Sequence, residues 1–289
     1  MSDPRLIGRR AFCGSAAGLA LWPMVAEAAP VELAAYERQT GGRVGVYAHD
    51  LRTGRKLAWR ADERFVMCSS FKASLAACVL HRVDKGKERL DRIIAYGPGD
   101  LLGNAPVARG NLAKGGLSVE EMCRAAVEVS DNTCANKLLA SIGSPAAMTA
   151  FWRSIGDQVT RLDHNEPELN RSPPGDPHDT TTPAAMAANL RRFVLGDVLS
   201  PASRGRMTDW MLGCQTGADR LRGGLPGAWK IGDKTGNNGA DAAGDIAVAW
   251  PSADRLILIA TYVQGGSPTP GQIKAVFAAV GRMVGRELD

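Results

Sequence analysis

Apolar and polar positions change their spacing along the chain in a way that predicts strands near both ends and helices between them. Two short alternating runs, at 43–47 and 56–59, flank a turn-rich segment at 50–54, as is typical of a β-hairpin. Alternation returns at 245–250 and 255–263, before a helix-like segment at 270–286. Helical spacing dominates the middle and predicts helices over 71–83, 119–129, 132–142, 145–155 and 183–195. We therefore expect strands to come first in the folded chain.

Strands from both chain ends and helices from the middle indicate one mixed fold. We expect an α/β (α+β) fold in which an antiparallel sheet is flanked by helices and carries an inserted all-helical domain. The sheet domain is expected to comprise 29–66 and 213–289, and the helical domain 67–212. The Pro- and Gly-rich stretch at 167–183 is too long for a simple connection, and loops of that length are often functional.

The first 28 residues have the pattern of a secretion signal. Three arginines among the first ten residues precede an apolar stretch at 11–25, which ends in an A-x-A cleavage pattern at 26–28. The adjacent Arg9 and Arg10 favour the twin-arginine route, and an ordinary signal with two basic residues is the alternative. No later segment has the roughly 18 apolar residues of a membrane span. We therefore expect residues 1–28 to be removed and the protein to be exported, to the periplasm or the medium, with no membrane contact after cleavage.

Composition, charge and cysteine spacing argue against a nucleic-acid partner and against a metal site. Hydrophobic residues make up 45% of the chain and charged residues 22%, as in an ordinary globular protein. The net charge of +5 includes the leader, and no basic run is interleaved with aromatic residues, so nucleic-acid binding is not expected. Of six cysteines only Cys13 lies in the leader, so an odd number remains and at least one thiol is unpaired. The spacing of the cysteines suggests no metal site, and we expect most of them to be small buried apolar residues. A disulfide is possible in an oxidising compartment, but the sequence does not indicate which cysteines would form it.

A serine and a lysine stand three residues apart in Ser69-Ser70-Phe71-Lys72, at the start of the first predicted helix. A serine hydroxyl is a weak nucleophile and needs an adjacent base. On a helix this spacing puts both side chains on one face, and the helix N-terminus points free N–H groups at a developing oxyanion. Alone the pair is weak evidence, because a surface helix start has the same pattern by chance.

Two tripeptides supply further polar side chains that could belong to the same site as the serine and the lysine. Ser130-Asp131-Asn132 lies between two predicted helices, where by itself it would be an ordinary helix cap. Lys234-Thr235-Gly236 stands just before a predicted strand, and its glycine would let a substrate or another backbone come close. The joint occurrence of the three motifs in this order makes each of them informative.

With these motifs the chain resembles the class A serine β-lactamases, which are related to penicillin-binding proteins. The resemblance covers about 33–288 and includes 161–183, where the segments at 166–170 and 175–183 are similar to the family's Ω-loop. It implies a β-lactamase/transpeptidase-like fold and an enzyme that hydrolyses penicillins and cephalosporins through an ester on Ser69, which would give antibiotic resistance. No cofactor and no metal would be needed. The partners would be β-lactam antibiotics and mechanism-based inhibitors. We expect a monomer, because the sequence shows no row of apolar residues that would indicate a subunit interface.

The resemblance also implies roles for single residues. Ser69 would attack the lactam carbonyl with Lys72 or Glu166 as the base, and Ser130 would pass the proton to the lactam nitrogen. Glu166 and Asn170 would activate the water that cleaves the ester. The oxyanion hole would be the backbone N–H groups of Ser69 and Asn237. The substrate-binding set would be Asn132, Lys234, Thr235, Gly236, Asn237 and Arg220.

Some positions depart from the family pattern. The stretch 242–245 lacks an arginine that many members use for the substrate carboxylate, so Arg220 would take that role unless it is a solvated surface charge. His164 stands where an arginine usually pairs with the aspartate that closes the Ω-loop. A His164–Asp179 pair is one expectation, and closure by an arginine at 161 or 171 is the equal alternative. If the pair forms, deacylation should slow at alkaline pH.

Two more departures leave the substrate range open. Cys68 precedes Ser69 as in carbapenem-hydrolysing relatives, but 237–239 lacks the cysteine that would bridge to it, so carbapenemase activity does not follow. The stretch 102–105 lacks the tyrosine that often lies at the mouth of the site.

A DD-peptidase and a β-lactam sensor are the alternatives to a β-lactamase. A DD-peptidase would make the same acyl-enzyme, but it has no need of Glu166 with Asn170. A sensor would acylate and stop, and it should be tethered in the membrane. The deacylation pair and the cleavable leader favour the β-lactamase interpretation.

Overall fold

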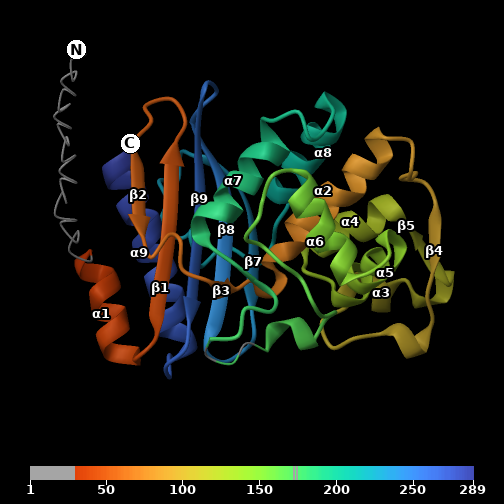
Figure 1. The fold of residues 1–289 in the computed structure, drawn as a ribbon, viewed down its shortest axis with the longest axis horizontal. Helices are drawn as coiled ribbons and strands as arrows, with labels where there is room; N and C mark the ends of the chain where they lie inside the picture. Colours follow the sequence, from red (N-terminus) through yellow and green to blue (C-terminus); the bar gives the residue numbers. More distant parts are fainter. Residues whose placement is uncertain (1–29, 172, 174) are drawn as a thin grey trace, which may run out of the picture.

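The structure, a computed structural model, describes residues 30–171, 173 and 175–289, so the predicted leader lies outside the described residues. A five-stranded antiparallel sheet has the strand order β2-β1-β9-β8-β7 (Figure 1). Its strands are β1 (Arg43–Asp50), β2 (Lys56–Trp59), β7 (Lys230–Asn237), β8 (Ala242–Ser252) and β9 (Arg255–Gln264). Both ends of the chain thus contribute strands to one sheet flanked by helices, as the sequence predicts.

Helices pack against both faces of this sheet (Figure 1). On one face lie α1 (Val31–Thr40) and α9 (Pro270–Leu288), which share a core with the sheet. The larger helical part lies toward the other face, and α7 packs on β1 and β9. Its helices are α2 (Phe71–Asp84), α3 (Pro106–Gly110), α4 (Val119–Glu128), α5 (Asn132–Ile142), α6 (Pro145–Ser154), α7 (Pro183–Val194) and α8 (Pro201–Leu212).

The central strand β9 is buried on both of its faces. Its Leu258 and Tyr262 belong to the core shared with the helical part, whereas Ile257 and Ile259 belong to the core under α1 and α9. Successive side chains of a strand point to opposite faces of a sheet. A strand covered on both sides therefore has an almost continuous apolar run.

Short elements connect the sheet with the region around the serine–lysine motif. Strand β3 (Phe65–Val66) pairs with β6 (Thr180–Thr181), which joins the end of the 161–183 loop to the segment just before Ser69. A second small ladder pairs β4 (Ile93–Ala95) with β5 (Gly116–Ser118). The 3₁₀ turns are η1 (Cys68–Ser70), η2 (Pro98–Asp100), η3 (Leu112–Lys114) and η4 (Glu168–Asn170).

Some sequence predictions of elements were wrong. A helix, α1, precedes the first strand, and α8 was not predicted at all. α1 buries only Leu33, Tyr36 and Thr40, a stripe too narrow to give a clear helical period. Lys234-Thr235-Gly236 precedes β8, as predicted, but it lies inside β7, a strand that was not predicted. This strand buries its charged and polar side chains along with its apolar ones, so its sequence shows no alternation.

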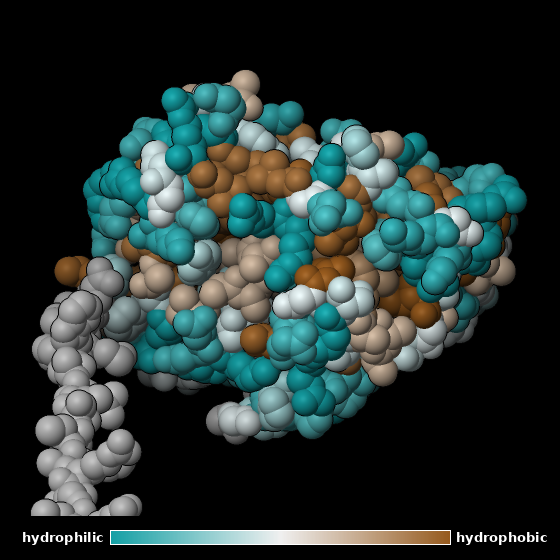
Figure 2. Space-filling model, turned by 45° about the horizontal axis from the view of Figure 1, so that its top comes forward, coloured by the Kyte–Doolittle hydropathy of each residue, from teal (hydrophilic) through white to brown (hydrophobic). Residues whose placement is uncertain are grey.

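The surface and the cysteines are those of an ordinary globular protein. On the face shown in Figure 2, hydrophobic residues form separate patches among hydrophilic ones. No helix in the described part of the chain is both long and apolar enough to cross a membrane. Cys68, Cys78, Cys123, Cys134 and Cys214 are all free and buried. The expectation that most cysteines behave as small buried residues is therefore confirmed.

Candidate active site

Ser69 lies in a tight turn that leads directly into a buried helix. The 3₁₀ turn η1 continues into α2, and Cys68 just before the serine has a left-handed φ of 45°. Ser69 is only 9% exposed and Lys72, one turn further on, is fully buried. The helix thus places the serine hydroxyl and the lysine amine on one side, as the three-residue spacing predicts.

Ser69, Lys72 and Glu166 form one contact group. The Ser69 hydroxyl donates to Glu166 Oε1 at 2.8 Å, and the Lys72 ammonium lies 3.0 Å from the same oxygen. Both partners of this ion pair have fully buried side chains. A buried charge persists only when it is paired and hydrogen-bonded. Ser69 therefore faces a carboxylate and an amine that are held together.

Burial and pairing shift the pKa values of this ion pair. Burial lowers the pKa of Lys72 below its ordinary value, although the Glu166 carboxylate opposes this shift. Burial pushes the pKa of Glu166 upward, but the Lys72 charge and the hydrogen bonds from Ser69, Lys72 and Asn170 together bring it below its ordinary value. Glu166 is therefore ionised at neutral pH and can accept a proton.

Ser130 and Asn132 come to the same place from the start of α5. Lys72 Nζ donates to the Ser130 carbonyl at 2.9 Å, to the Ser130 hydroxyl at 3.3 Å and to Asn132 Oδ1 at 2.5 Å. Ser130 has a left-handed φ of 59°, a conformation uncommon outside glycine. Asp131 between them caps α5 through Cys134 N, as the helix-cap interpretation predicts.

The opposite wall of the site is the end of β7, which lies against η1. A Cβ built on Gly236 would lie 2.7 Å from Ser69 N and 2.8 Å from Ser70 N, so only glycine allows this approach. Asn237 is the next residue and the last of the strand. The strand thus brings the backbone around Asn237 close to that of Ser69, where an oxyanion hole would need two N–H groups.

Three side chains supply the positive and hydroxyl groups of this wall. Lys234 is fully buried, and its pKa is lowered to about 8, mainly by this burial. The nearby charges of Lys72 and Arg220 also lower this pKa, whereas Cys214 and Asp233 raise it. The Thr235 hydroxyl shares a 2.6 Å hydrogen bond with Thr216. Arg220 donates to the carbonyls at Gly236 and Gly244, at 2.9 Å each. Arg220 is thus anchored beside β7 and is not a freely solvated charge.

Asn170 completes the Glu166 side of the site. Its Nδ2 donates to Glu166 Oε2 at 2.6 Å and to the Pro167 carbonyl at 2.9 Å. Its Oδ1 is buried and has no hydrogen-bond partner among the described residues. Because buried polar atoms are normally satisfied, this oxygen is suited to accept a hydrogen bond from a substrate or from water.

Two features of the site were missed by sequence reasoning. Asn136 on α5 accepts the Glu166 N–H at 2.9 Å and donates to the Glu166 carbonyl at 2.8 Å. Asn104 donates to the Ser130 carbonyl at 2.9 Å, and its own carbonyl accepts the Asn132 N–H. Asn136 follows Asn132 by four residues on one helix, and this spacing on one face was the available signal.

The loop-closing contact is made by His164. Its Nδ1 lies 2.6 Å from Asp179 Oδ2, so the expected His164–Asp179 pair is present. Arg161 instead pairs with Asp163, at 2.9 and 2.6 Å. The partner of Asp179 is therefore the histidine, and Arg161 contributes to the neck only through Asp163.

Asn136→Ala is expected to slow deacylation by about tenfold to a hundredfold, because leaving two buried groups of Glu166 unpaired costs ~1–3 kcal/mol. Rapid-quench measurement of ester decay would show it. Asn111→Ala is a matched control, since Asn111 also binds a backbone carbonyl, that of Val107, but lies outside the site. Equal decay rates in the two variants would contradict the role of Asn136.

No group of three or more His, Cys, Asp or Glu side chains in the described residues could hold a metal ion. What the arrangement offers is a serine with a paired carboxylate and amine, a second serine, and a cationic wall. Such a set can form and then cleave a covalent ester.

Comparison with known proteins agrees with this chemistry. The model of the Beta-lactamase enzyme family matches residues 29–288. Beta-lactamase L2 of Stenotrophomonas maltophilia is 48% identical over 259 residues, which cover 89% of this chain and 85% of that protein. Beta-lactamase CTX-M-25 of Escherichia coli is 41% identical over 268 residues, with 92% of each chain covered.

Solved structures give the same result for the fold. An ancestral class A β-lactamase matches with a TM-score of 0.84 and 55% identity, covering 88% of this chain and 97% of that one. A β-lactamase from Xanthomonas campestris matches with a TM-score of 0.86 and 47% identity, covering 89% and 96%. The chain therefore belongs to the β-lactamase enzyme family and is a class A enzyme that hydrolyses β-lactams.

Proposed function

We propose that the enzyme opens penicillins and cephalosporins by forming an ester on Ser69, and that a water activated by Glu166 cleaves this ester. The observation that carries the proposal is the shared contact at Glu166 Oε1, which accepts from Ser69 at 2.8 Å and pairs with Lys72 at 3.0 Å. A serine so placed can lose its proton as it attacks a carbonyl carbon.

In the acylation step, Ser69 Oγ bonds to the lactam carbonyl carbon and its proton passes to the Glu166–Lys72 pair. Glu166 can take the proton directly through its hydrogen bond with Ser69, and Lys72 can take it once its own proton has passed to Glu166 and left a neutral amine. Lys72 also donates to the Ser130 hydroxyl, which gives the proton a route to the lactam nitrogen as the C–N bond breaks. Backbone N–H groups of Ser69 and Asn237 would stabilise the oxyanion.

Deacylation depends more strictly on Glu166. A water between the ester and Glu166 would transfer one proton to the carboxylate, which later passes it to the departing Ser69 Oγ, and would keep the other in a hydrogen bond to Asn170 Oδ1, a buried oxygen with no partner among the described residues. Its oxygen then bonds to the ester carbonyl carbon, and Ser69 Oγ leaves with a proton. Lys72, as a charged ammonium, has no lone pair to accept a proton from this water, so Glu166 would be the base in this step.

The cationic wall would fix the substrate. Lys234, the Thr235 hydroxyl and Arg220 lie along β7, where they suit the carboxylate that penicillins and cephalosporins carry. Asn132 would bind the amide side chain, and Gly236 lets the substrate lie against the strand. We also propose that the enzyme acts as a monomer, that mechanism-based inhibitors acylate the same serine, and that a leader at 1–28 directs its export.

The test mixes the mature protein with excess chromogenic cephalosporin and, separately, with a penicillin, while turnover and intact-protein mass are followed. Sustained turnover with a transient adduct on the peptide that contains Ser69 is the expected result. A single stoichiometric burst with a lasting adduct would contradict the proposal and indicate a DD-peptidase or a sensor.

A further inference from the structure

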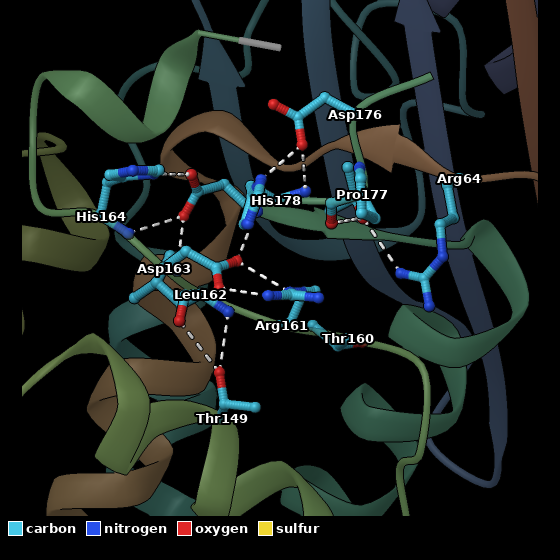
Figure 3. Close-up of polar contacts among 12 residues, drawn as sticks. Arg64, Thr149, Thr160, Arg161, Leu162, Asp163, His164, Asp176, Pro177 and His178 are labelled. Atoms are coloured by element: carbon cyan, nitrogen blue, oxygen red, sulfur yellow. Dashed lines mark hydrogen bonds and ion pairs between the residues drawn. The ribbon is translucent and has the colours of Figure 1, made fainter. Parts of the chain in front are cut away.

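The neck of the Ω-loop is the place where residues 161–164 and 176–180 run side by side (Figure 3). Arg161 N donates to the Thr180 carbonyl at 3.0 Å. Asp163 N donates to Asp179 Oδ1 at 2.7 Å, and Asp179 N donates to Asp163 Oδ2 at 3.0 Å. Each aspartate thus accepts the backbone N–H of the other, and the two carboxylates hold the neck closed.

The two carboxylates differ in the cation that faces them. Asp163 is paired with Arg161, which is charged at every pH of interest. Asp179 is fully buried and its cation is the imidazole of His164, 2.6 Å away, whose side chain is 52% exposed. His164 is therefore the one of these two partners whose charge changes near neutral pH.

We propose that His164 is a positioning residue for deacylation: its protonated ring fixes Asp179 and the neck, and loss of that proton loosens the loop that carries Glu166. The inference rests on the proposed role of Glu166 in cleaving the ester. It concerns a histidine that touches neither the substrate nor the reacting atoms.

The charged groups around His164 favour its protonated form. Asp163, Asp176 and Asp179 all lie near it, and the hydrogen bond with Asp179 raises its pKa above the ordinary value. The ring also meets His178 edge-on, with the ring centroids 5.9 Å apart. His178 in turn binds Asp176 Oδ1 at 2.5 Å, so each histidine has a carboxylate of its own (Figure 3).

The neck is coupled to Glu166 through a short stretch of backbone. Only Asn165 separates His164 from Glu166, and the Asn165 carbonyl accepts the N–H of Leu169 in the turn that carries Asn170. A shift of the neck is therefore passed to both groups that would hold the deacylating water. Acylation is less sensitive to the same shift, because its nucleophile is Ser69 Oγ and it needs no water held by Glu166 and Asn170.

The direction of the pH effect follows from the raised pKa. The stabilisation by His164 is fully present below the ordinary imidazole value of about 6.5 and is lost as the pH rises through the raised value. A neutral imidazole can still donate Nδ1–H to the Asp179 carboxylate, but it no longer carries a positive charge, so the coulombic attraction between the two side chains is lost. We expect the deacylation rate to fall roughly threefold to tenfold toward alkaline pH, while acylation changes less.

The experiment measures acylation and deacylation separately by rapid quench and intact-protein mass, with one penicillin, from mildly acidic to alkaline pH. Wild type should show the alkaline fall in deacylation. His164→Arg should remove the fall, because its charge is permanent, and His164→Asn should deacylate slowly at every pH. Imidazole titration by NMR gives a readout without activity: the His164 pKa should be above the ordinary value and should drop in Asp179→Asn.

Two neighbouring variants serve as matched controls. His178→Asn removes the other loop histidine and should keep the alkaline fall, whereas Arg161→Gln should lower deacylation by the same factor at every pH. An alkaline fall of equal size in His164→Arg would overturn the proposal, as would a flat wild-type profile. Failure of the proposed function would look different, because no acyl-enzyme would form on Ser69 or none would decay.

Discussion

Glu166→Gln is expected to leave an enzyme that still acylates but scarcely turns over. The glutamine keeps the size of the side chain but cannot take a proton from the water that cleaves the ester. We expect kcat to fall by about 10²- to 10⁴-fold, the usual contribution of a positioned general base. Acylation should fall less, because the pKa of Lys72 is lowered by burial, and without the Glu166 charge the factor that opposed this shift is gone.

The measurement is the intact mass of the variant after it has been mixed with a penicillin. A lasting adduct of one opened β-lactam on the protein is the expected outcome. Glu168→Gln is a matched control, since Glu168 lies two residues further along the same loop and is exposed. It should turn over like wild type, and Ser69→Ala should form no adduct. Rapid turnover by Glu166→Gln would show that another group activates the water.

Gly236→Ala is expected to disrupt acylation through the backbone. The new Cβ would lie 2.7 Å from Ser69 N and 2.8 Å from Met67 O, distances that real Cβ atoms do not show. Both are backbone atoms, so no side chain can rotate away, and β7 must separate from η1. The pair of N–H groups at Ser69 and Asn237 would then be too far apart for one oxyanion.

Loss of one oxyanion-hole donor typically costs about 10²- to 10³-fold in rate, and overpacking costs ~1–3 kcal/mol in stability. We therefore expect kcat/KM for a cephalosporin to fall by about that factor, together with a lower thermal midpoint. Gly227→Ala is the control, because a Cβ there has no atom within 4 Å and should leave both quantities unchanged. Wild-type kinetics in Gly236→Ala would refute the assignment of the oxyanion hole to this contact.

The parts of the fold that the sequence predicts are those with a clear hydrophobic period. The helix at 132–142 was predicted with the bounds that the structure gives, and β9 within one residue. α1 and β7 were not predicted correctly, because α1 buries a narrow stripe and β7 buries Asp233, Lys234 and Thr235 along with apolar residues. Where a strand buries polar side chains at a functional site, the pattern of hydrophobic residues alone does not predict that strand.

Most residues that meet at the candidate site come from three short motifs, which can be read directly from the sequence. Ser69 and Lys72 belong to one motif, and the structure brings them together with Ser130 and Glu166 from distant parts of the chain. The residues that hold them, such as Asn136 with Glu166 or Thr216 with Thr235, were not found. Such contacts depend on tertiary packing between distant segments, which leaves no local pattern in the sequence.

The position of β1 in the sheet has a consequence for how the chain folds. Its eight residues pair with β9 from Arg43↔Gln264 to Asp50↔Ile257, so its partner is more than 200 residues away along the chain. The residues of β1 and β2 are synthesised long before those of β9, and until β9 pairs with β1 that edge of β1 has unpaired N–H and C=O groups. Contacts of this sequence separation form late and slow folding. The five-stranded sheet can close only once β9, which ends at residue 264, is available to pair with β1, so closure of the sheet is a late step of folding.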